Sequence, residues 1–286
     1  MTIEVLDTHQ HLIYADRFGY QWTDPIPALA GRSFTYADYQ HAATDTGISS
    51  TLFMEATSED WRPETDMVQE MVENPDMIVS GIIAGCRPEN PDFDAWLDAI
   101  ADRPVAGLRR ILHVMPDELS RDDSFRVNIR KLASRGLTFD LCFLGRQLAV
   151  AADLARSCEN VQFILDHCGV PDIAAGDMDP WRERISSLAA IPNVACKISG
   201  VTAYAKSGEG TVEVVRPWVE HCLECFGWDR VVWGSDWPVC NINADLAEWA
   251  AISREIVSGE DPQNQAKLFR DNAIRIYGLE RMGFDT

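Results

Sequence analysis

The chain has 286 residues, of which 46% are hydrophobic and 24% are charged, a composition typical of a soluble globular protein. Its formal net charge of −20 argues against binding to nucleic acid or to anionic membranes, because both require a basic surface. No apolar run reaches the ~18 residues of a membrane span, and the N-terminal residues do not resemble a signal peptide, so a cytoplasmic location is expected.

Apolar, β-branched segments alternate with helical patterns along almost the whole chain. Most of the apolar segments are continuously hydrophobic, as expected for parallel strands that are covered on both faces. The expected strands are residues 4–11, 50–56, 78–85, 105–113, 137–143, 161–169, 193–200 and 230–237. The expected helices are residues 36–46, 64–73, 92–102, 122–135, 146–158, 181–190, 212–226, 244–257 and 263–277.

Eight strand–helix repeats predict an α/β fold, a single (β/α)₈ TIM barrel in one domain spanning residues 1–286. A doubly wound open sheet normally has fewer strands and often a glycine-rich turn after the first one. Two histidines stand at that position here, so the barrel is favoured. Two long loops, residues 14–33 and 202–210, follow strands on the expected mouth side and are candidates for a wall or lid over a substrate.

Polar side chains stand near the ends of seven expected strands, and in such barrels the C-terminal strand ends surround one mouth. They are His9, His11, Glu55, Arg109, His113, Asp140, His167, Lys197 and Asp236. Because side chains two apart on a strand point to the same face, His9 and His11 are expected to lie side by side. Asp166 directly precedes His167 and is therefore expected to face the other way.

Imidazole and carboxylate groups from several strand ends suit a zinc ion or a similar divalent cation. His9, His11, His167 and Asp236 are the candidate ligands. Glu55 is either a further ligand or a group that orders one of the histidines.

Eight cysteines occur in a chain without a secretion signal, and they are expected to be buried thiols. Cys142, Cys168 and Cys196 each lie in or just after an apolar strand. The CxxC spacing of Cys222 and Cys225 is only a weak indication of zinc or redox chemistry, because no second pair accompanies it.

Four motifs resemble those of the amidohydrolase superfamily. They are the Asp-x-His-x-His of residues 7–11, the Asp-His-Cys-Gly of 166–169, the Lys-x-Ser-Gly of 197–200 and the Gly-Ser-Asp-Trp-Pro of 234–238. The last two are similar to the branch of lactone hydrolases that includes fucono- and rhamnono-lactonases and pyrone-dicarboxylate lactonase. The resemblance spans the whole chain and implies a (β/α)₈ barrel, hydrolysis at a carbonyl, and Asp236 as the residue that transfers the proton.

The chain departs from the superfamily's two-metal pattern at two strands. The fourth strand carries Arg109 and His113 where a bridging lysine or glutamate is usual, and the fifth offers Asp140 and no histidine. A two-metal site is therefore not expected. One divalent ion, with zinc favoured, and a metal-independent site both remain open.

Lactone hydrolysis needs an activated water, a polarised carbonyl and a proton for the departing ring oxygen. Asp236 is the expected general base and acid, assisted by His167. Arg109 is expected to grip a substrate carboxylate or hydroxyl, with His113 on the same face. Lys197 is either a second anion contact or a buried ion-pair partner, and Arg110 is expected to form a structural pair between barrel and helices.

Aromatic side chains provide candidate surfaces on which a sugar ring could pack. They are Tyr14, Tyr20 and Trp22 in the first long loop and Trp237 after the eighth strand. Trp237 could equally be a structural cap over the barrel.

The favoured function is hydrolysis of a sugar-acid lactone, which is then the expected small-molecule partner. Hydrolysis of an aromatic-degradation lactone, of the pyrone-dicarboxylate or muconolactone type, is the alternative, and a second cation near Arg109 would favour it. A metal-dependent decarboxylase and a binding barrel without turnover are further options. The oligomeric state, including a homo-oligomer, is open.

Overall fold

Eight parallel strands form one sheet in the order of the chain, β1 to β8, in a computed structural model that describes residues 3–56 and 61–285. The strands are β1 (Val5–Gln10), β2 (Ile48–Met54), β3 (Val79–Gly85), β4 (Val105–Ile111), β5 (Thr138–Cys142), β6 (Phe163–Leu165), β7 (Val194–Ser199) and β8 (Val231–Gly234). The last strand returns to the first, because Gln10 and Trp237 form a parallel bridge and the Asp236 amide donates to the His9 carbonyl at 2.7 Å. The predicted (β/α)₈ barrel is confirmed.

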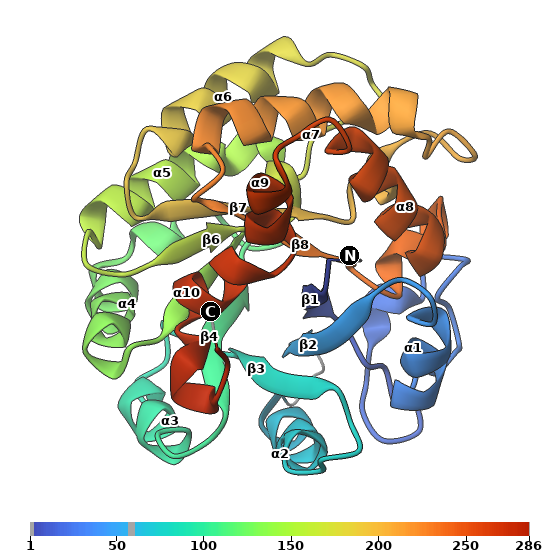
Figure 1. Ribbon diagram of the computed structural model, residues 1–286. Coiled ribbons are helices and arrows are strands. Elements are labelled where there is room, and N and C mark those ends of the chain that lie inside the picture. The colour runs from blue at the N-terminus through green and yellow to red at the C-terminus, as the bar shows by residue number, and fades with distance from the viewer. Residues whose placement is uncertain (1–2, 57–60, 286) are drawn as a thin grey trace.

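Helices surround the barrel between successive strands (Figure 1). They are α1 (Tyr36–Ala42), α2 (Trp61–Val72), α3 (Phe93–Ala99), α4 (Asp123–Arg135), α5 (Leu148–Ser157), α6 (Asp179–Ala189), α7 (Val212–Phe226) and α8 (Leu246–Ile256). Glycine in a left-handed conformation ends α4 at Gly136, as the sequence predicts. None of the helices in the described ranges is long and apolar enough to cross a membrane.

The chain ends in helices that close the N-terminal end of the barrel, which faces the viewer in Figure 1. The single helix expected over residues 263–277 is instead divided into α9 (Pro262–Ala266), a π-helical turn (Lys267–Asp271) and α10 (Asn272–Tyr277). Side chains of α10 pack with the barrel interior in one apolar cluster, which includes Leu6, Leu52, Ile83, Ile164, Val232, Ile274 and Tyr277. A larger apolar cluster lies outside it, between the strands and the surrounding helices.

β6 and β8 fall furthest short of the expected ranges, and both end early on the mouth side. The strand expected over 161–169 ends at Leu165, because His167, Cys168, Gly169 and Val170 all have φ between +48° and +70°. The strand expected over 230–237 ends at Gly234, and Asp236 has φ +57°. In both segments the strand ends where the apolar run ends, and the polar motif that follows lies in the turn.

Candidate active site

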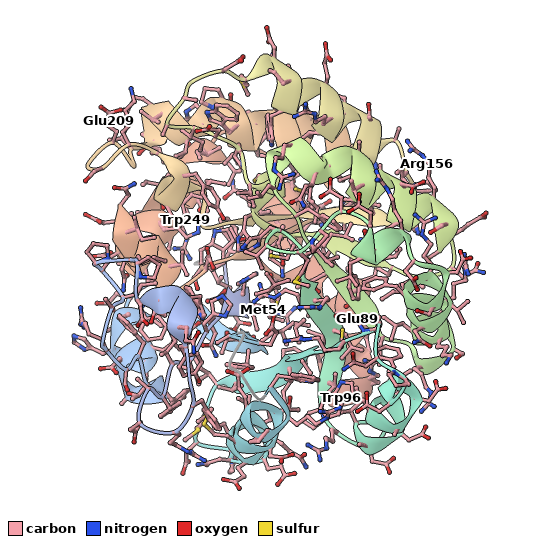
Figure 2. The ribbon with its side chains drawn as sticks, turned by 180° about the vertical axis from the view of Figure 1, so that it is seen from behind. Met54, Glu89, Trp96, Arg156, Glu209 and Trp249 are labelled. Atoms are coloured by element: carbon pink, nitrogen blue, oxygen red, sulfur yellow. The ribbon has the colours of Figure 1, made fainter. Side chains whose placement is uncertain are left out.

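A cavity of about 350 Å³ opens at the C-terminal ends of the strands, a size typical of small-molecule sites. Its polar lining comes from His11, Arg109, His113, His167 and Asp236. The rest of the described lining is mainly apolar and includes Trp22, Ile26, Ala56, Ile111, Val114, Leu144, Val170, Tyr204, Val239 and Ile242. Figure 2 looks onto this side of the barrel, where Met54 lies near the centre and Glu209 near the outer edge.

His9, His11 and Asp236 converge at the floor of the cavity. The two imidazole Nε2 atoms are 3.2 Å apart, and Asp236 Oδ1 lies 3.6 Å from Nε2 of His9 and 3.5 Å from Nε2 of His11. The prediction that the two histidines lie side by side is confirmed. Ligands bound to one zinc ion at ~2.0–2.1 Å in a tetrahedron lie about 3.3 Å apart, so this spacing fits one metal ion.

The orientation of His11 also suits a metal ion. Nδ1 of His11 lies 2.9 Å from the Met54 carbonyl, so it carries the proton and leaves a lone pair on Nε2. Nδ1 of His9 lies 3.4 Å from Asp166 Oδ1 and 3.3 Å from the Lys197 ammonium, so its contacts include both an acceptor and a donor and do not select one tautomer. Burial lowers the pKa of His11 to about 3 and that of His9 well below its usual value, with nearby cations contributing, so the neutral form of both rings is favoured.

Asp166 belongs to this cluster, and the expectation that it faces away from His167 is wrong. Its carboxylate is fully buried, with Oδ1 3.0 Å from Lys197 Nζ and Oδ2 3.6 Å from Arg109 Nη1. Strand alternation does not apply, because β6 ends at Leu165 and the following left-handed turn brings both side chains inward. Burial opposes ionisation, but Lys197 and His9 hold the pKa of Asp166 well below its usual range.

His167 lies beside Asp236, with Nδ1 3.5 Å from Oδ2, and its ring centre is 4.4 Å from that of His9. The Ser199 hydroxyl lies 3.0 Å from the same Nδ1, which leaves Nε2 for a substrate or an ion. Burial lowers the pKa of His167 and raises that of Asp236 to about 6. Asp236 is therefore mostly ionised at neutral pH and still basic enough to accept a proton.

Lys197 is fully buried in an ion pair below the cavity and does not line it. Its ammonium lies 2.5 Å from Asp140 Oδ1, which also accepts a hydrogen bond from the Tyr277 hydroxyl at 2.9 Å. Of the two roles expected for Lys197, the structure shows the buried pair. Asp140, expected near the mouth, lies in this pair.

Arg109 lines the cavity but is largely held by Glu55. Its Nε donates to Glu55 Oε1 at 3.0 Å and its Nη2 to the Glu55 carbonyl at 2.5 Å, while Nη1 lies 3.2 Å from His9 Nε2. Among the described residues, Glu55 is not in either group of candidate metal ligands at the mouth, and its carboxylate contacts Arg109. Arg110 points outward to Glu89 at 2.7 Å, as expected for a structural pair. His113 lies on the cavity wall with Nδ1 3.2 Å from the Cys142 sulfur.

The predicted aromatic residues divide between wall and support. Trp22 lines the cavity, and its Nε1 donates to the Ala56 carbonyl at 2.7 Å. Trp237 is buried against Phe34 and Tyr39 with ring centres 5.7 and 5.4 Å away, so it caps the barrel outside the cavity lining. Tyr14 also lies outside the lining, and its hydroxyl accepts from the Tyr36 amide at 3.1 Å.

Three residues that the sequence argument did not single out shape the site. Tyr204 lines the cavity 6.3 Å from the His167 ring. Ser199 contacts His167, as described above. A Cβ atom at Gly200 would lie 2.2 Å from Asp236 Oδ2, so only glycine leaves room for this carboxylate. The Lys-x-Ser-Gly motif could have revealed the roles of Ser199 and Gly200, because they contact His167 and Asp236, whereas Tyr204 lies outside the motif.

Comparisons with known proteins agree on one family. A family model described as amidohydrolase matches residues 6–279. The L-fucono-1,5-lactonase of Burkholderia ambifaria is 28% identical over 98% of this chain and 97% of its own length. The L-rhamnono-gamma-lactonase of Scheffersomyces stipitis is 25% identical over 61% of this chain and 59% of its own. A zinc-bound amidohydrolase structure from Burkholderia multivorans has a TM-score of 0.88 at 21% identity, covering 96% of this chain and 99% of that one.

Proposed function

Because the chain belongs to the amidohydrolase family, we propose that it hydrolyses the lactone of a sugar acid by attack of water on the ester carbonyl. The observation that carries this proposal is the convergence of three histidines, Arg109 and Asp236 on one cavity. The names of the relatives support the lactone class, and the cavity volume of about 350 Å³ suits a single sugar ring.

Asp236 is the residue proposed to move the proton. Its carboxylate removes a proton from the attacking water and later returns it to the ring oxygen as the C–O bond breaks. Nη1 of Arg109 is the donor proposed for the developing oxyanion, because the other two guanidinium nitrogens are held by Glu55. His167, fixed by Ser199, orients the substrate or the water from the opposite side of the carboxylate.

His9, His11 and Asp236, joined by His167, are the residues that would hold a single divalent cation. A bound zinc ion would acidify the water and polarise the carbonyl. Their spacing of 3.2–3.6 Å and the Nε2 lone pair of His11 support this assignment. Glu55 is left out of the set, because its carboxylate contacts Arg109.

The cavity lining separates the proposed substrate from the aromatic-degradation alternative. A dicarboxylate lactone would need two cationic contacts, and Arg109 is the one arginine or lysine among the described lining residues. Lys197, the other candidate, is occupied by Asp140 and Asp166. A neutral ring with one face against Trp22 and Tyr204 fits this lining better.

A pH-indicator assay over a panel of aldonolactones and dicarboxylate lactones tests the proposal. We expect acid release from at least one aldonolactone, no release of CO₂, and a loss of activity with a chelator that zinc restores. Failure of metal-replete protein to open any lactone would refute the lactonase proposal. Full activity in protein shown to be metal-free would refute the zinc assignment alone.

A further inference from the structure

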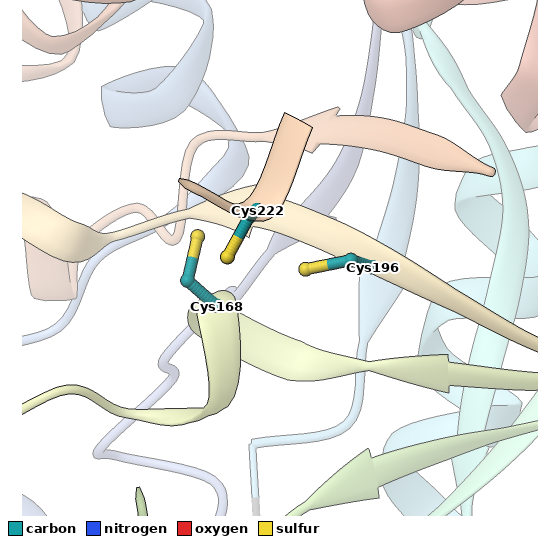
Figure 3. Close-up of side chains that lie close together, drawn as sticks. All are labelled: Cys168, Cys196 and Cys222. Atoms are coloured by element: carbon teal, nitrogen blue, oxygen red, sulfur yellow. The ribbon is translucent and has the colours of Figure 1, made fainter. Parts of the chain in front are cut away.

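A second cluster of ligand-type side chains lies in the barrel wall, outside the cavity lining. The sulfur atoms of Cys168, Cys196 and Cys222 all lie within 4.8 Å of one another. Figure 3 shows the three thiols pointing toward one another from the turn after β6, from β7 and from α7. Each of the three residues has a relative exposure of 0%.

The three sulfurs come from parts of the chain that only the fold brings together. Of the CxxC pair noted in the sequence, only Cys222 belongs to the cluster. Cys225 lies away from it, with its sulfur 3.4 Å from Ser186 Oγ and from His221 Nε2. We infer that Cys168, Cys196 and Cys222 form a trigonal binding site for a soft monovalent cation, of which Cu(I) is the biological example.

The ligand set selects this class of ion. Thiolates bind soft ions such as Cu(I), whereas carboxylates and water suit magnesium and calcium. In a planar site with three ion–sulfur distances of about 2.3 Å, the sulfur atoms lie about 4.0 Å from one another. The three sulfur atoms of this cluster lie within 4.8 Å of one another, so they can approach that geometry. Structural zinc sites almost always have four ligands, and the described cluster provides three.

An ion has to displace the thiol protons, because burial raises the pKa of Cys196 and of Cys222 well above the usual range of a thiol. Binding releases one proton to solvent for each thiol that becomes a thiolate. The backbone of Ser199 hydrogen-bonds the Cys168 sulfur, and the Arg230 guanidinium donates to the Val194 carbonyl at 2.9 Å on the strand that carries Cys196. This soft site is chemically distinct from the imidazole and carboxylate groups at the mouth.

Competition with a coloured Cu(I) chelator tests the inference on the full-length, reduced protein without oxygen. We expect each chain to remove one Cu(I) from the chelator and to develop a thiolate-to-copper absorption band in the near ultraviolet. Cys222→Ser should lower the affinity at least tenfold, whereas Cys158→Ser, which changes another buried thiol, should leave it unchanged. An unchanged affinity in Cys222→Ser would overturn the site, as would a wild-type chain that takes no copper.

A second measurement needs no variant and does not depend on the folding of Cys222→Ser. Alkylation of the thiols in mild denaturant, followed by mass spectrometry, reports each cysteine separately. We expect Cu(I) to slow alkylation of Cys168, Cys196 and Cys222 together and to leave Cys86 unaffected. Equal protection of all cysteines, or of none, would contradict the assignment. Neither readout involves hydrolysis, so the result stands apart from the lactonase proposal.

Discussion

Single side chains decide the chemistry at the mouth, and Asp236 is the clearest case. Its buried carboxylate lies between His9 and His11 on one side and His167 on the other. The same crowding explains the glycine at position 200, because a larger residue would occupy the space of Oδ2. The carboxylate proposed to move the proton therefore depends on glycine at position 200.

Asp236→Asn should lower kcat by about 10²–10⁴-fold, because the amide cannot accept the proton of the attacking water. Steady-state kinetics on the aldonolactone found in the panel measures the effect. Asp153→Asn, which removes an exposed carboxylate paired with Arg126, is the control and should retain full activity. If Asp236→Asn kept most of its kcat while folded, another group would have to be the base.

Gly200→Ala should reduce kcat at least tenfold, because the new Cβ displaces the Asp236 carboxylate. Gly278→Ala separates this clash from backbone strain, since Gly278 is also left-handed, with φ +61° against the +60° of Gly200, and its added Cβ would meet only Arg281 Nη1 at an ordinary 3.7 Å. Each change should cost roughly 1–2 kcal/mol of stability from the left-handed conformation. Equal activity of the two variants would show that the clash does not disturb catalysis.

At the scale of elements, the turns after β6 and β8 place His167 and Asp236, whereas His9 and Arg109 lie within strands. Four consecutive left-handed residues after β6 carry His167 and Cys168 in opposite directions, one into the mouth and one into the thiol cluster. A β-branched residue, Val170, is included, which is unusual in this conformation. The contacts of this turn, including the hydrogen bond from Trp181 Nε1 to the Cys168 carbonyl at 2.9 Å, hold it in place.

Helix α2 is joined to the mouth by Glu64, a buried carboxyl whose pKa is raised to about 8 by burial and by Glu55. It accepts hydrogen bonds from the Ala56 amide at 3.1 Å and from the Tyr20 hydroxyl at 3.3 Å. The folded protein holds this proton more tightly than the unfolded chain, whose glutamates have a pKa near ~4.3. Its contribution to stability is therefore complete below about pH 4 and is lost as the pH rises through about 8.

Glu64→Gln should reduce the dependence of folding stability on pH between about pH 4 and about pH 8. Denaturant unfolding from pH 5 to 8 should show wild-type stability falling relative to the variant, by an amount on the order of a few kcal/mol at most. Glu70→Gln, at an exposed position of α2, is the matched control and should follow the wild type. Parallel profiles for wild type and Glu64→Gln would mean that Glu64 is not protonated in the folded protein.

At the scale of the whole molecule, the barrel is divided into an apolar lower part and a charged upper part. Side chains of α10 close the lower end, and Tyr277 reaches from there to Asp140. Above it, Lys197 and Arg109 offset the buried carboxylates of Asp140, Asp166 and Glu55. This internal charge pairing allows a chain of net charge −20 to place a cationic guanidinium at its mouth.

Zinc binding at the mouth should stabilise the entire barrel, because the ligands from β1 and from the segment after β8 meet only in the folded state. Zinc added to chelator-treated protein should raise Tm, with about 2.7 kcal/mol gained at one hundred times Kd. His11→Ala should abolish the rise, and Cys222→Ser should retain it. A thermal melt that does not respond to zinc would contradict the assignment of His9, His11 and Asp236 as ligands.

The sequence by itself determined the barrel, the side-by-side histidines and the set of strand ends that carry the site. Those features follow from local hydrophobic patterns and from the geometry common to all parallel barrels, which a linear pattern records. The tertiary structure alone decided that Asp166 faces the cluster, that Lys197 is buried, that Glu55 holds Arg109, and that three distant thiols meet. Each of these depends on a left-handed turn or on a contact between elements far apart in the chain, and neither leaves a periodic signal in the sequence.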